Sequence, residues 1–467
     1  MDRLIEMENI EQLLLSKNDI GLATDLYELT MAAAYFTSRQ TDRIGVFEAF
    51  VRKLPKNRLY MVAAGLEQAI HYLLNLGFTE EHIQYLKSLS TFSNVGNDFF
   101  EYLKNFRFTG DLWAVPEGTV LFPNEPILRV EAPIIESQIV ETFLLSTVNF
   151  QSLIATKASR IANAAAGRNI IEFGFRRAHG PQAALLAARA SYIGGCAGTS
   201  NALAGYKLGI PAFGTMAHSF VMNFESEIEA FIQFSKVFPD GLLLVDTYDT
   251  LASVKKIVKH GIKARGIRLD SGDLYELSVK SRAILDDAGY YDAIIMASGD
   301  LNEYIISDLV KRNAPIDTFG VGTELTTSRD DPAMNGVYKL VAIRIPTQEK
   351  GKPDRILYRQ KMSPSKKTYP GPKQVHRTSK DGIIKTDLIA LEDEHAPEHS
   401  IQLLKRYIAD GKLERNMPSL KEIQKYHHEQ MKMLSSEFKS LVVTAVEFPV
   451  AFSDRLETMV REFVAHE

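Results

Sequence analysis

The chain has 467 residues, of which 45% are hydrophobic and 24% charged, a balance typical of a soluble globular protein with several domains or one large barrel with additions. Its net charge of −4 gives no strong electrostatic field, which argues against nucleic acid or an anionic membrane as a partner. The single cysteine, Cys196, excludes an internal disulfide and a cysteine-rich zinc site, and it fits a reducing compartment.

Residues 1–19 carry charges throughout and contain no uninterrupted apolar region, so we expect no signal peptide. No apolar run reaches the ~18 residues that a membrane span needs. These features predict a cytoplasmic protein that acts on small molecules.

The N-terminal part mixes helix and strand signals. Thr24 or Asp25 is expected to cap a helix, and the alternating apolar residues of 44–55 predict a strand. Residues 108–129 are dense in Gly, Pro and short apolar runs, which indicates short strands joined by tight turns. We therefore expect an α+β domain over residues 1–135, with a helical segment starting at about Glu136.

The middle of the chain is more regular, because short apolar runs alternate there with amphipathic stretches. The apolar runs are 169–175, 210–216, 241–246, 264–270, 293–300 and 317–323. The helix candidates between them are 181–207, 219–236, 250–260, 274–288 and 301–312. This alternation predicts a parallel sheet, and the number of units in succession favours an α/β barrel over residues 136–345.

After residue 345 the pattern breaks. Residues 346–377 are basic and rich in Pro and Gly, which indicates an extended hairpin. Residues 401–413 and 420–434 have the spacing of amphipathic helices, and residues 440–454 contain a further strand candidate. We expect residues 346–467 to form a C-terminal extension that packs with the N-terminal domain.

Polar residues follow nearly every predicted strand of the middle region. In a parallel barrel the carboxyl ends of the strands share one rim, where such enzymes place their active sites. The residues concerned are Arg176, Arg177, His179, His218, Asp246, Thr247, Asp249, Arg268, Asp270, Asp273, Ser298, Gly299, Asp300, Gly322 and Thr323. The pattern predicts an enzyme with its site on this rim.

The turns "ASGDL" and "GVGTEL" combine glycine with a hydroxyl residue after neighbouring strands. Glycine lets backbone N–H groups approach an anion, so the two turns together predict a phosphate cradle. Arg176, Arg177 and Arg268 nearby match phosphate and carboxylate oxygens. The aspartates of the rim either hold Mg²⁺ beside the phosphates or form salt bridges with these arginines.

Eight stretches run in order from about residue 20 to about 380: "TDLYELTMAAAYF", "FEAFVRKLP", "FGFRRAHGP", "GTSNALAGYKLGIPAFGTMAHSF", "LLVDTYDT", "GIRLDSGDL", "FGVGTEL" and "KMSPSKKTYPGPKQVHR". Together they resemble nicotinate phosphoribosyltransferases. The resemblance implies the irregular α/β barrel of type II phosphoribosyltransferases, with a second α+β domain built from the N- and C-terminal segments.

The resemblance also implies a reaction. Nicotinate and phosphoribosyl pyrophosphate give nicotinate mononucleotide and pyrophosphate in NAD biosynthesis, with Mg²⁺ and with ATP hydrolysis coupled through a phosphohistidine. That histidine corresponds to His218 in "GTMAHSF". A neutral imidazole is a competent nucleophile near neutral pH.

Further roles carry over from the resemblance. Tyr27 is expected to stack on the nicotinate ring from a neighbouring subunit of a homodimer with shared active sites. Thr215 and Arg268 are expected to contact nicotinate, and Arg176 the substrate or its phosphates. Two larger groups complete the expected site: Ser298, Gly299, Gly322 and Thr323 around the 5′-phosphate, and Asp270 and Asp300 on Mg²⁺ or the ribose hydroxyls. The lysine-rich stretch 361–377 is expected to close over the nucleotide.

Other functions remain open from the residues. Nicotinamide phosphoribosyltransferase is the main alternative, because it shares the fold and the histidine. An amide needs a hydrogen-bond acceptor where nicotinate needs a cation, and the stretches "FGFRRAHGP" and "FGTMAHSF" favour the acid. Quinolinate phosphoribosyltransferase fits the chain less well, because those chains are shorter and need no phosphorylatable histidine. A metal-dependent hydrolase would use His218, His179 and the aspartates, and a non-catalytic sensor of NAD precursors would keep the cradle without turnover.

Overall fold

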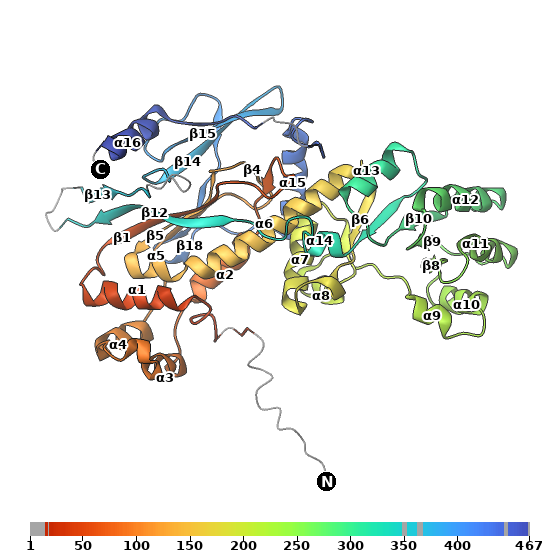
Figure 1. Cartoon of the computed structure of the whole chain (residues 1–467), viewed down its shortest axis with the longest axis horizontal. Helices are drawn as coiled ribbons and strands as arrows, with labels where there is room; N and C mark the ends of the chain where they lie inside the picture. Colours follow the sequence, from red (N-terminus) through yellow and green to blue (C-terminus); the bar gives the residue numbers. More distant parts are fainter. Residues whose placement is uncertain (1–14, 17, 348–352, 362–367, 443–446, 466–467) are drawn as a thin grey trace, which may run out of the picture.

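The computed structural model describes residues 15–16, 18–347, 353–361, 368–442 and 447–465. It has two lobes, and the long helix α6 (Glu141–Ala164) extends from one into the other (Figure 1). Within the described residues, no helix combines the length and the apolar character needed to cross a membrane.

One lobe is built around a six-stranded parallel sheet with the order β7-β6-β11-β10-β9-β8. Its strands are β6 (Asn169–Glu172), β7 (Gly198–Thr199), β8 (Leu242–Leu244), β9 (Gly266–Leu269), β10 (Ile294–Ala297) and β11 (Thr318–Val321). Leu243, Ile267, Ile295 and Phe319 are fully buried in one apolar core. Burial on both faces explains why these strands appear in the sequence as continuous apolar runs.

The strand order is that of a barrel opened at one seam. Read as a ring, the order follows the chain from β6 to β11, and the ladder that would close the ring is the one between β7 and β8. Among the described strands no such ladder exists. The predicted strand 210–216 lies next to β7 instead and makes a single parallel bridge, Thr199 to Ala212. The predicted irregular α/β barrel is confirmed, and this seam is its irregularity.

Helices α7 to α14 accompany the parallel strands: α7 (Pro181–Ile193), α8 (Ala202–Leu208), α9 (His218–Met222), α10 (Glu227–Val237), α11 (Thr250–Lys259), α12 (Leu274–Asp287), α13 (Glu303–Lys311) and α14 (Thr323–Thr326). Two predicted helices were too long. The helix predicted over 181–207 ends at Ile193, because Gly195 takes the left-handed φ of 108° that glycine favours, and β7 follows. The helix predicted over 219–236 is two helices, with Ser226 capping the second.

The other lobe joins both chain ends. Its seven-stranded antiparallel sheet has the order β13-β12-β1-β5-β3-β17-β18. The strands are β1 (Ile44–Val51), β3 (Asp111–Ala114), β5 (Pro126–Pro133), β12 (Gly336–Ile345), β13 (Arg355–Tyr358), β17 (Lys405–Ala409) and β18 (Lys412–Leu413). Helices pack with this sheet in a second core: α1 (Leu26–Thr37), α2 (Leu66–Asn75), α3 (Glu80–Ser88), α4 (Asn97–Lys104) and α5 (Ile134–Ile139). The predicted second α+β domain from the N- and C-terminal segments is therefore confirmed.

The remaining strands form a four-stranded sheet and a short pair in the same lobe. The sheet contains β14 (Lys373–Lys380), β15 (Ile383–Leu391), β16 (Ser400–Gln402) and β19 (Val450–Phe452), and the pair is β2 (Met61–Val62) with β4 (Val120–Leu121). Helices α15 (Leu420–Met433) and α16 (Asp454–Ala465) complete the chain. The helix over 420–434 and the strand within 440–454 agree with the prediction.

The helix predicted over 401–413 was wrong, because β16, β17 and β18 occupy this segment. Asp410 and Gly411 have φ of 48° and 69°, and they form the two-residue turn between β17 and β18. An Asp-Gly pair with two positive φ angles is a hairpin turn, and β17 is then held by β3. The ranges 1–135, 136–345 and 346–467 stay predictions, although β12 pairs with β1 and not with the parallel strands.

Candidate active site

Arg268 stands at the centre of the predicted rim and joins residues from three chain segments. Its Nη1 donates to Thr215 Oγ1 at 3.0 Å, its Nε to Ser298 Oγ at 2.8 Å, and its Nη2 to Asp270 Oδ1 at 2.6 Å. β9 positions the arginine, β10 ends next to Ser298, and Thr215 comes from the segment at the seam. The structure therefore brings four of the predicted site residues together.

Asp270 is an ionised carboxylate at this point. Burial by itself would raise its pKa, but the Ser298 hydroxyl, which donates at 2.5 Å, and the Arg268 guanidinium lower the pKa below its ordinary value. Of the two readings for the rim aspartates, the salt bridge with arginine applies to Asp270 Oδ1. Its other oxygen, Oδ2, lies 3.9 Å from His218 Nε2.

His218 is the first residue of α9, directly after the segment that lies at the seam. Its Nδ1 is 3.1 Å from the Thr247 hydroxyl at the end of β8, so the imidazole plane is held between β8 and β9. The side chain keeps 41% of its exposure. The imidazole is therefore both oriented and accessible from solvent, which a histidine buried for packing alone is not.

Asp246 lies at the same edge, where the sequence predicted either a ligand of Mg²⁺ or a salt bridge with an arginine. Its Oδ2 accepts from the backbone N–H of Asp270 at 3.1 Å and from the Ser271 hydroxyl at 2.5 Å. Its Oδ1 is buried and has no hydrogen-bond partner within the described part of the chain. A buried carboxylate oxygen without a donor is costly, and no described residue offsets that cost at Asp246 Oδ1.

Sterics favour glycine in the two predicted phosphate turns, strongly at Gly299 and less so at Gly322. Gly299 has a φ of 107°, and a Cβ there would lie 2.6 Å from the Asp270 carbonyl oxygen. A Cβ on Gly322 would lie 3.1 Å from the carbonyl oxygen of Phe173. Thr323 follows as the first residue of α14. Both turns thus pack closely against the backbone that follows a neighbouring strand.

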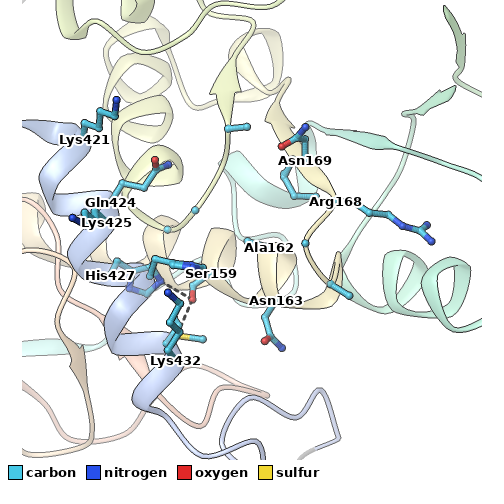
Figure 2. A pocket seen from close by; sticks show the side chains of 18 of the residues that line it. Ser159, Ala162, Asn163, Arg168, Asn169, Lys421, Gln424, Lys425, His427 and Lys432 are labelled. Atoms are coloured by element: carbon cyan, nitrogen blue, oxygen red, sulfur yellow. Dashed lines mark hydrogen bonds between the residues drawn. The ribbon is translucent and has the colours of Figure 1, made fainter. Parts of the chain in front are cut away.

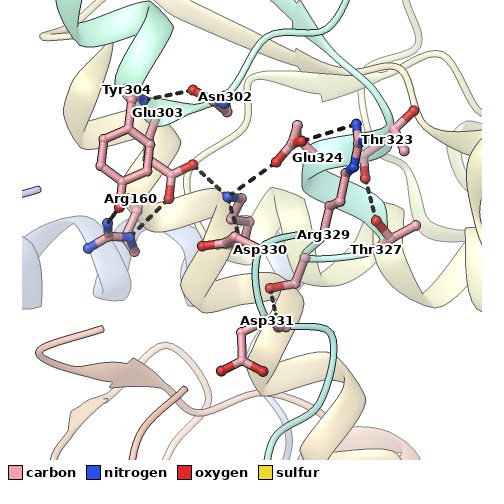
Figure 3. A network of polar contacts seen from close by, with 12 residues as sticks. Arg160, Asn302, Glu303, Tyr304, Thr323, Glu324, Thr327, Arg329, Asp330 and Asp331 are labelled. Carbon is pink, nitrogen blue, oxygen red and sulfur yellow. Dashed lines mark hydrogen bonds and ion pairs between the residues drawn. The ribbon is translucent and has the colours of Figure 1, made fainter. Parts of the chain in front are cut away.

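A buried ionic network supports both turns from behind (Figure 3). Lys157 of α6 is buried, and its Nζ lies 2.6 Å from Glu303 and 2.9 Å from Asp330. It also lies 3.8 Å from Glu324. Arg160, one turn further along α6, pairs with Glu303 at 3.2 Å. Since Glu303 begins α13 and Glu324 lies in α14, a single lysine ties down the helices that follow both phosphate turns.

Asp330 is the outer member of this network. Arg58 holds it with two hydrogen bonds of 2.6 Å and 3.0 Å. Burial opposes ionisation, but Arg58 and Lys157 lower the pKa of Asp330 far below its ordinary range, so the network stays charged near neutral pH.

A cleft of about 450 Å³ lies beside the cradle, and Asp270, Ser298 and Asp300 line it. Asp300 is exposed and makes no ion pair or hydrogen bond within the described residues. Two carboxylates and a hydroxyl in one cleft are oxygen donors of the kind that Mg²⁺ takes together with substrate phosphates. No cluster of three or more metal-ligating side chains occurs among the residues the structure describes.

Other predicted residues make no hydrogen bond to Arg268 within the described part of the chain, and some of them cap helices. Arg176 and Arg177 are exposed on a short 3-10 helix after β6, and Tyr27 is 48% exposed on α1 in the other lobe (Figure 1). Asp249 and Asp273 cap α11 and α12 through the backbone N–H groups of Ala252 and Glu276, respectively. Part of the lysine-rich stretch, 362–367, lies outside the described residues.

Phe173 was missed by the sequence interpretation. Its ring lies 5.5 Å from the Arg268 guanidinium carbon, at the end of β6. An aromatic face next to a cation is suited to an aromatic anion, which can stack on the ring while the guanidinium binds its charge. The available signal was the aromatic pair in "EFGFRR", directly before the arginines.

Three family models cover most of the chain. They are the nicotinate phosphoribosyltransferase (NAPRTase) N-terminal domain over residues 22–149, the NAPRTase family over 169–367, and the nicotinate phosphoribosyltransferase C-terminal domain over 399–460. Nicotinate phosphoribosyltransferase pncB2 from Mycobacterium tuberculosis is 45% identical over 443 residues, which span 93% of this chain and 92% of that protein. The chain belongs to the nicotinate phosphoribosyltransferase family.

Other relatives agree with this assignment. Nicotinate phosphoribosyltransferase from Bacillus subtilis is 40% identical over 468 residues, spanning 94% of both chains. The crystal structure of human nicotinic acid phosphoribosyltransferase aligns with a TM-score of 0.80 at 27% identity, over 94% of this chain and 99% of that one. Both lobes are therefore shared with the nicotinate phosphoribosyltransferase family, including the C-terminal segment that the sequence motifs left unassigned.

Proposed function

We propose that this chain transfers the phosphoribosyl group of phosphoribosyl pyrophosphate to nicotinate, giving nicotinate mononucleotide and pyrophosphate in NAD biosynthesis. The observation that carries the proposal is the position of Arg268. Its guanidinium faces Phe173 and Thr215 on one side and bonds Ser298 of the phosphate turn on the other. One cation thus lies between a place for an aromatic carboxylate and a place for a phosphate.

The residue types fit the chemistry of this displacement. When pyrophosphate leaves the anomeric carbon, positive charge builds on the ribose and negative charge on the leaving group. Arg268 is suited to bind the nicotinate carboxylate and hold the ring nitrogen in line with that carbon, which is positioning rather than acid–base work. Ser298 and the backbone at Gly299, Gly322 and Thr323 would receive the 5′-phosphate, and the exposed Arg176 would reach the outer phosphates.

Asp270 and Asp300 would hold Mg²⁺ beside the substrate phosphates, because their carboxylates line one cleft. When bound, the ion neutralises charge on the departing pyrophosphate. The two aspartates also offer acceptors to the ribose hydroxyls.

We further propose that ATP phosphorylates His218. The Thr247 hydroxyl orients Nδ1, and Nε2 is the nitrogen that faces the rim beside Asp270. In this step a bond forms between the imidazole nitrogen and the γ-phosphorus while the bond from that phosphorus to the bridging oxygen breaks, and ADP leaves. Water later hydrolyses the phosphohistidine to phosphate. The added charge beside Asp270 would alter the affinity of the site for substrates and products.

Tyr27 supports a homodimer with shared sites. It is an exposed aromatic on the lobe that carries no other predicted site residue, so in a homodimer it is available to stack on nicotinate at the rim of the partner. Nicotinamide is the alternative substrate. The arginine in this position favours the acid, because the amide has no negative charge to pair with a guanidinium.

The experiment is an assay of nicotinate mononucleotide formation from nicotinate and phosphoribosyl pyrophosphate, with and without ATP. Wild type, His218→Ala and the control His71→Ala, an exposed histidine on α2, are compared. We expect ATP to stimulate wild type and the control, and we expect His218→Ala to lose the stimulation and the ATPase activity. Nicotinamide is assayed in parallel.

Each alternative has its own result. An ATP effect that survives in His218→Ala would keep the transferase and refute the role of the histidine. Turnover with nicotinamide and none with nicotinate would assign the alternative substrate. A subunit-mixing assay tests the shared site, because two inactive variants, Tyr27→Ala and Arg268→Ala, should restore activity when their subunits are mixed.

A further inference from the structure

A cavity of about 940 Å³ lies at the amino ends of β6 and β7, opposite the rim. Figure 2 shows it between α15 on one side and the start of β6 on the other, with α6 below. The loops 166–169 and 194–197, which lead into β6 and β7, complete its wall. None of the residues assigned above to substrate or ATP lines it.

One face of α15 carries a row of lysines, with one histidine among them, along this cavity. Lys421, Lys425, His428 and Lys432 all line it, at a spacing that repeats along a single helix face. Lys439, after the helix, adds another ammonium group. The helical repeat therefore places these residues on one face of α15, and the packing of α15 puts that face at the cavity.

The positive charges of the wall outnumber the negative ones, although Glu422 and Glu429 both interact electrostatically with Lys425. Glu422 is the one carboxylate among the described lining residues, and the backbone N–H and hydroxyl of Ser419 occupy its Oε2 at 2.8 Å and 2.7 Å. Lys432 pairs with Glu429 at 3.0 Å. Lys421 and Lys425 form no ion pair within the described part of the chain. Like charges concentrated at a concave surface create a positive potential that attracts anions.

Apart from Arg168, the rest of the wall is uncharged and largely apolar. Ala162, Ala166 and Ala197 line the side opposite α15, and the Met431 side chain lies at its edge. His427 at the base is buried, which lowers its pKa to about 4, and its ring nitrogens bond the Gly118 carbonyl and the Ser159 hydroxyl at 3.0 Å each. This histidine is thus neutral and already engaged.

We propose that this cavity is a second binding site, separate from the rim, for a phosphate-bearing anion of nucleotide size. Lysines bind phosphates as point charges, and the row on α15 can follow a chain of several phosphates. The small apolar residues opposite leave room for a base or ring. The volume falls within the range of about 300–1,000 Å³ that is usual for small-molecule sites.

The test is calorimetric titration of the full-length protein at low ionic strength with ATP and, separately, with inorganic tripolyphosphate. Wild type is compared with Lys421→Glu/Lys425→Glu, which reverses two exposed charges of the row. The control is Lys255→Glu/Lys259→Glu, with the same spacing and charge change on exposed positions of α11. Lys421→Gln/Lys425→Gln serves as a milder variant, and circular dichroism checks that α15 is intact.

We expect the α15 variant to bind one equivalent of ATP fewer than wild type, or to bind that equivalent at least about tenfold more weakly. The control should match wild type, and basal transferase activity should be unchanged in all variants. Because the measure is a difference of one equivalent, it does not depend on how many equivalents the rim binds. The same variant should also lose one binding site for tripolyphosphate.

Equal stoichiometry and affinity for both probes in wild type and the α15 variants would overturn the proposal. An equal loss in the α11 control would also overturn it, since the effect would then be one of net charge. A failure of the rim to bind ATP would leave the one-equivalent difference in place, so the two proposals are tested separately.

Discussion

Arg268 holds Thr215, Ser298 and Asp270 at the same time, which only the planar fork of a guanidinium can do. Arg268→Lys keeps the charge and removes the fork. Hydrogen bonds to charged groups contribute about 1.5–3 kcal/mol, so we expect the KM for nicotinate to rise about 10- to 100-fold. Steady-state kinetics with nicotinate varied, with the exposed Arg415→Lys as control, measures this. An unchanged KM for nicotinate would show that Arg268 does not bind nicotinate.

Glu136 makes stability depend on pH in the direction opposite to most carboxylates. Burial raises its pKa to about 7, although Thr109 donates to it from its backbone N–H at 2.6 Å and its hydroxyl at 2.9 Å. The folded protein then binds a proton that the unfolded chain releases near its ordinary pKa of about 4.5. The favourable contribution is complete below that value and is lost as the pH rises through about 7.

Glu136→Gln should therefore stabilise the protein at pH 8 and have little effect at pH 4.5. The glutamine amide can accept from the Thr109 N–H and donate to its hydroxyl. The rise in the pKa of Glu136 corresponds to about 3 kcal/mol in the free energy of unfolding, and chemical denaturation at both pH values can measure a change of this size. The exposed Glu398→Gln is the control. Equal effects of Glu136→Gln at the two pH values would contradict the prediction.

At the scale of elements, α6 anchors the helices that follow the phosphate turns. Lys157→Met removes the charge that Glu303, Asp330 and Glu324 share. Loss of one partner from a buried ion pair costs about 3–5 kcal/mol, because the other charge stays buried. We expect this loss in the free energy of unfolding, together with a KM for phosphoribosyl pyrophosphate that rises more than the KM for nicotinate.

The control for α6 is Lys280→Met, which breaks an exposed pair with Glu276 on α12. A second variant separates stability from positioning. Lys157→Met combined with Glu303→Gln should recover part of the stability, since the unpaired buried charge is gone. Should both KM values rise equally in Lys157→Met, the network would support the fold without positioning the cradle.

A helix or strand could be predicted where the residues that determine it lie close together in the sequence. The parallel strands could be predicted because strands buried on both faces are uninterrupted apolar runs. The segment 401–413 was misassigned because its apolar residues also suit a helix, and the turn at Asp410 and Gly411 decided for strands once β3 was available as a partner. The helix end after Ile193 depends on the positive φ of Gly195. Glycine also occurs inside helices, so the sequence alone did not predict this end.

At the scale of the whole molecule, the C-terminal segment completes cores that the rest of the chain begins. Phe448 stacks on Phe122 with ring centres 3.6 Å apart, in a cluster that also contains Ile154 of α6. Phe448→Ala should lower the free energy of unfolding by about 3–5 kcal/mol through the cavity it leaves. We expect one cooperative unfolding transition, at a lower denaturant concentration than in wild type. Circular dichroism measures this transition.

Val442→Ala, at a position 71% exposed, is the matched control and should change little. A second, separate transition in Phe448→Ala would show instead that the C-terminal segment unfolds on its own.

The sequence by itself determined the α/β barrel, the rim, the glycine turns and the histidine at the junction before α9, because each depends on residues close together in the chain. Only the tertiary structure decided which of them meet. His218 contacts Thr247 across 29 positions, and Lys157 reaches Asp330 across 173. The tertiary structure also decided that the basic residues of α15 line a cavity. In the sequence they form an ordinary solvated helix face. Such contacts depend on how distant segments pack, and no local pattern encodes that packing.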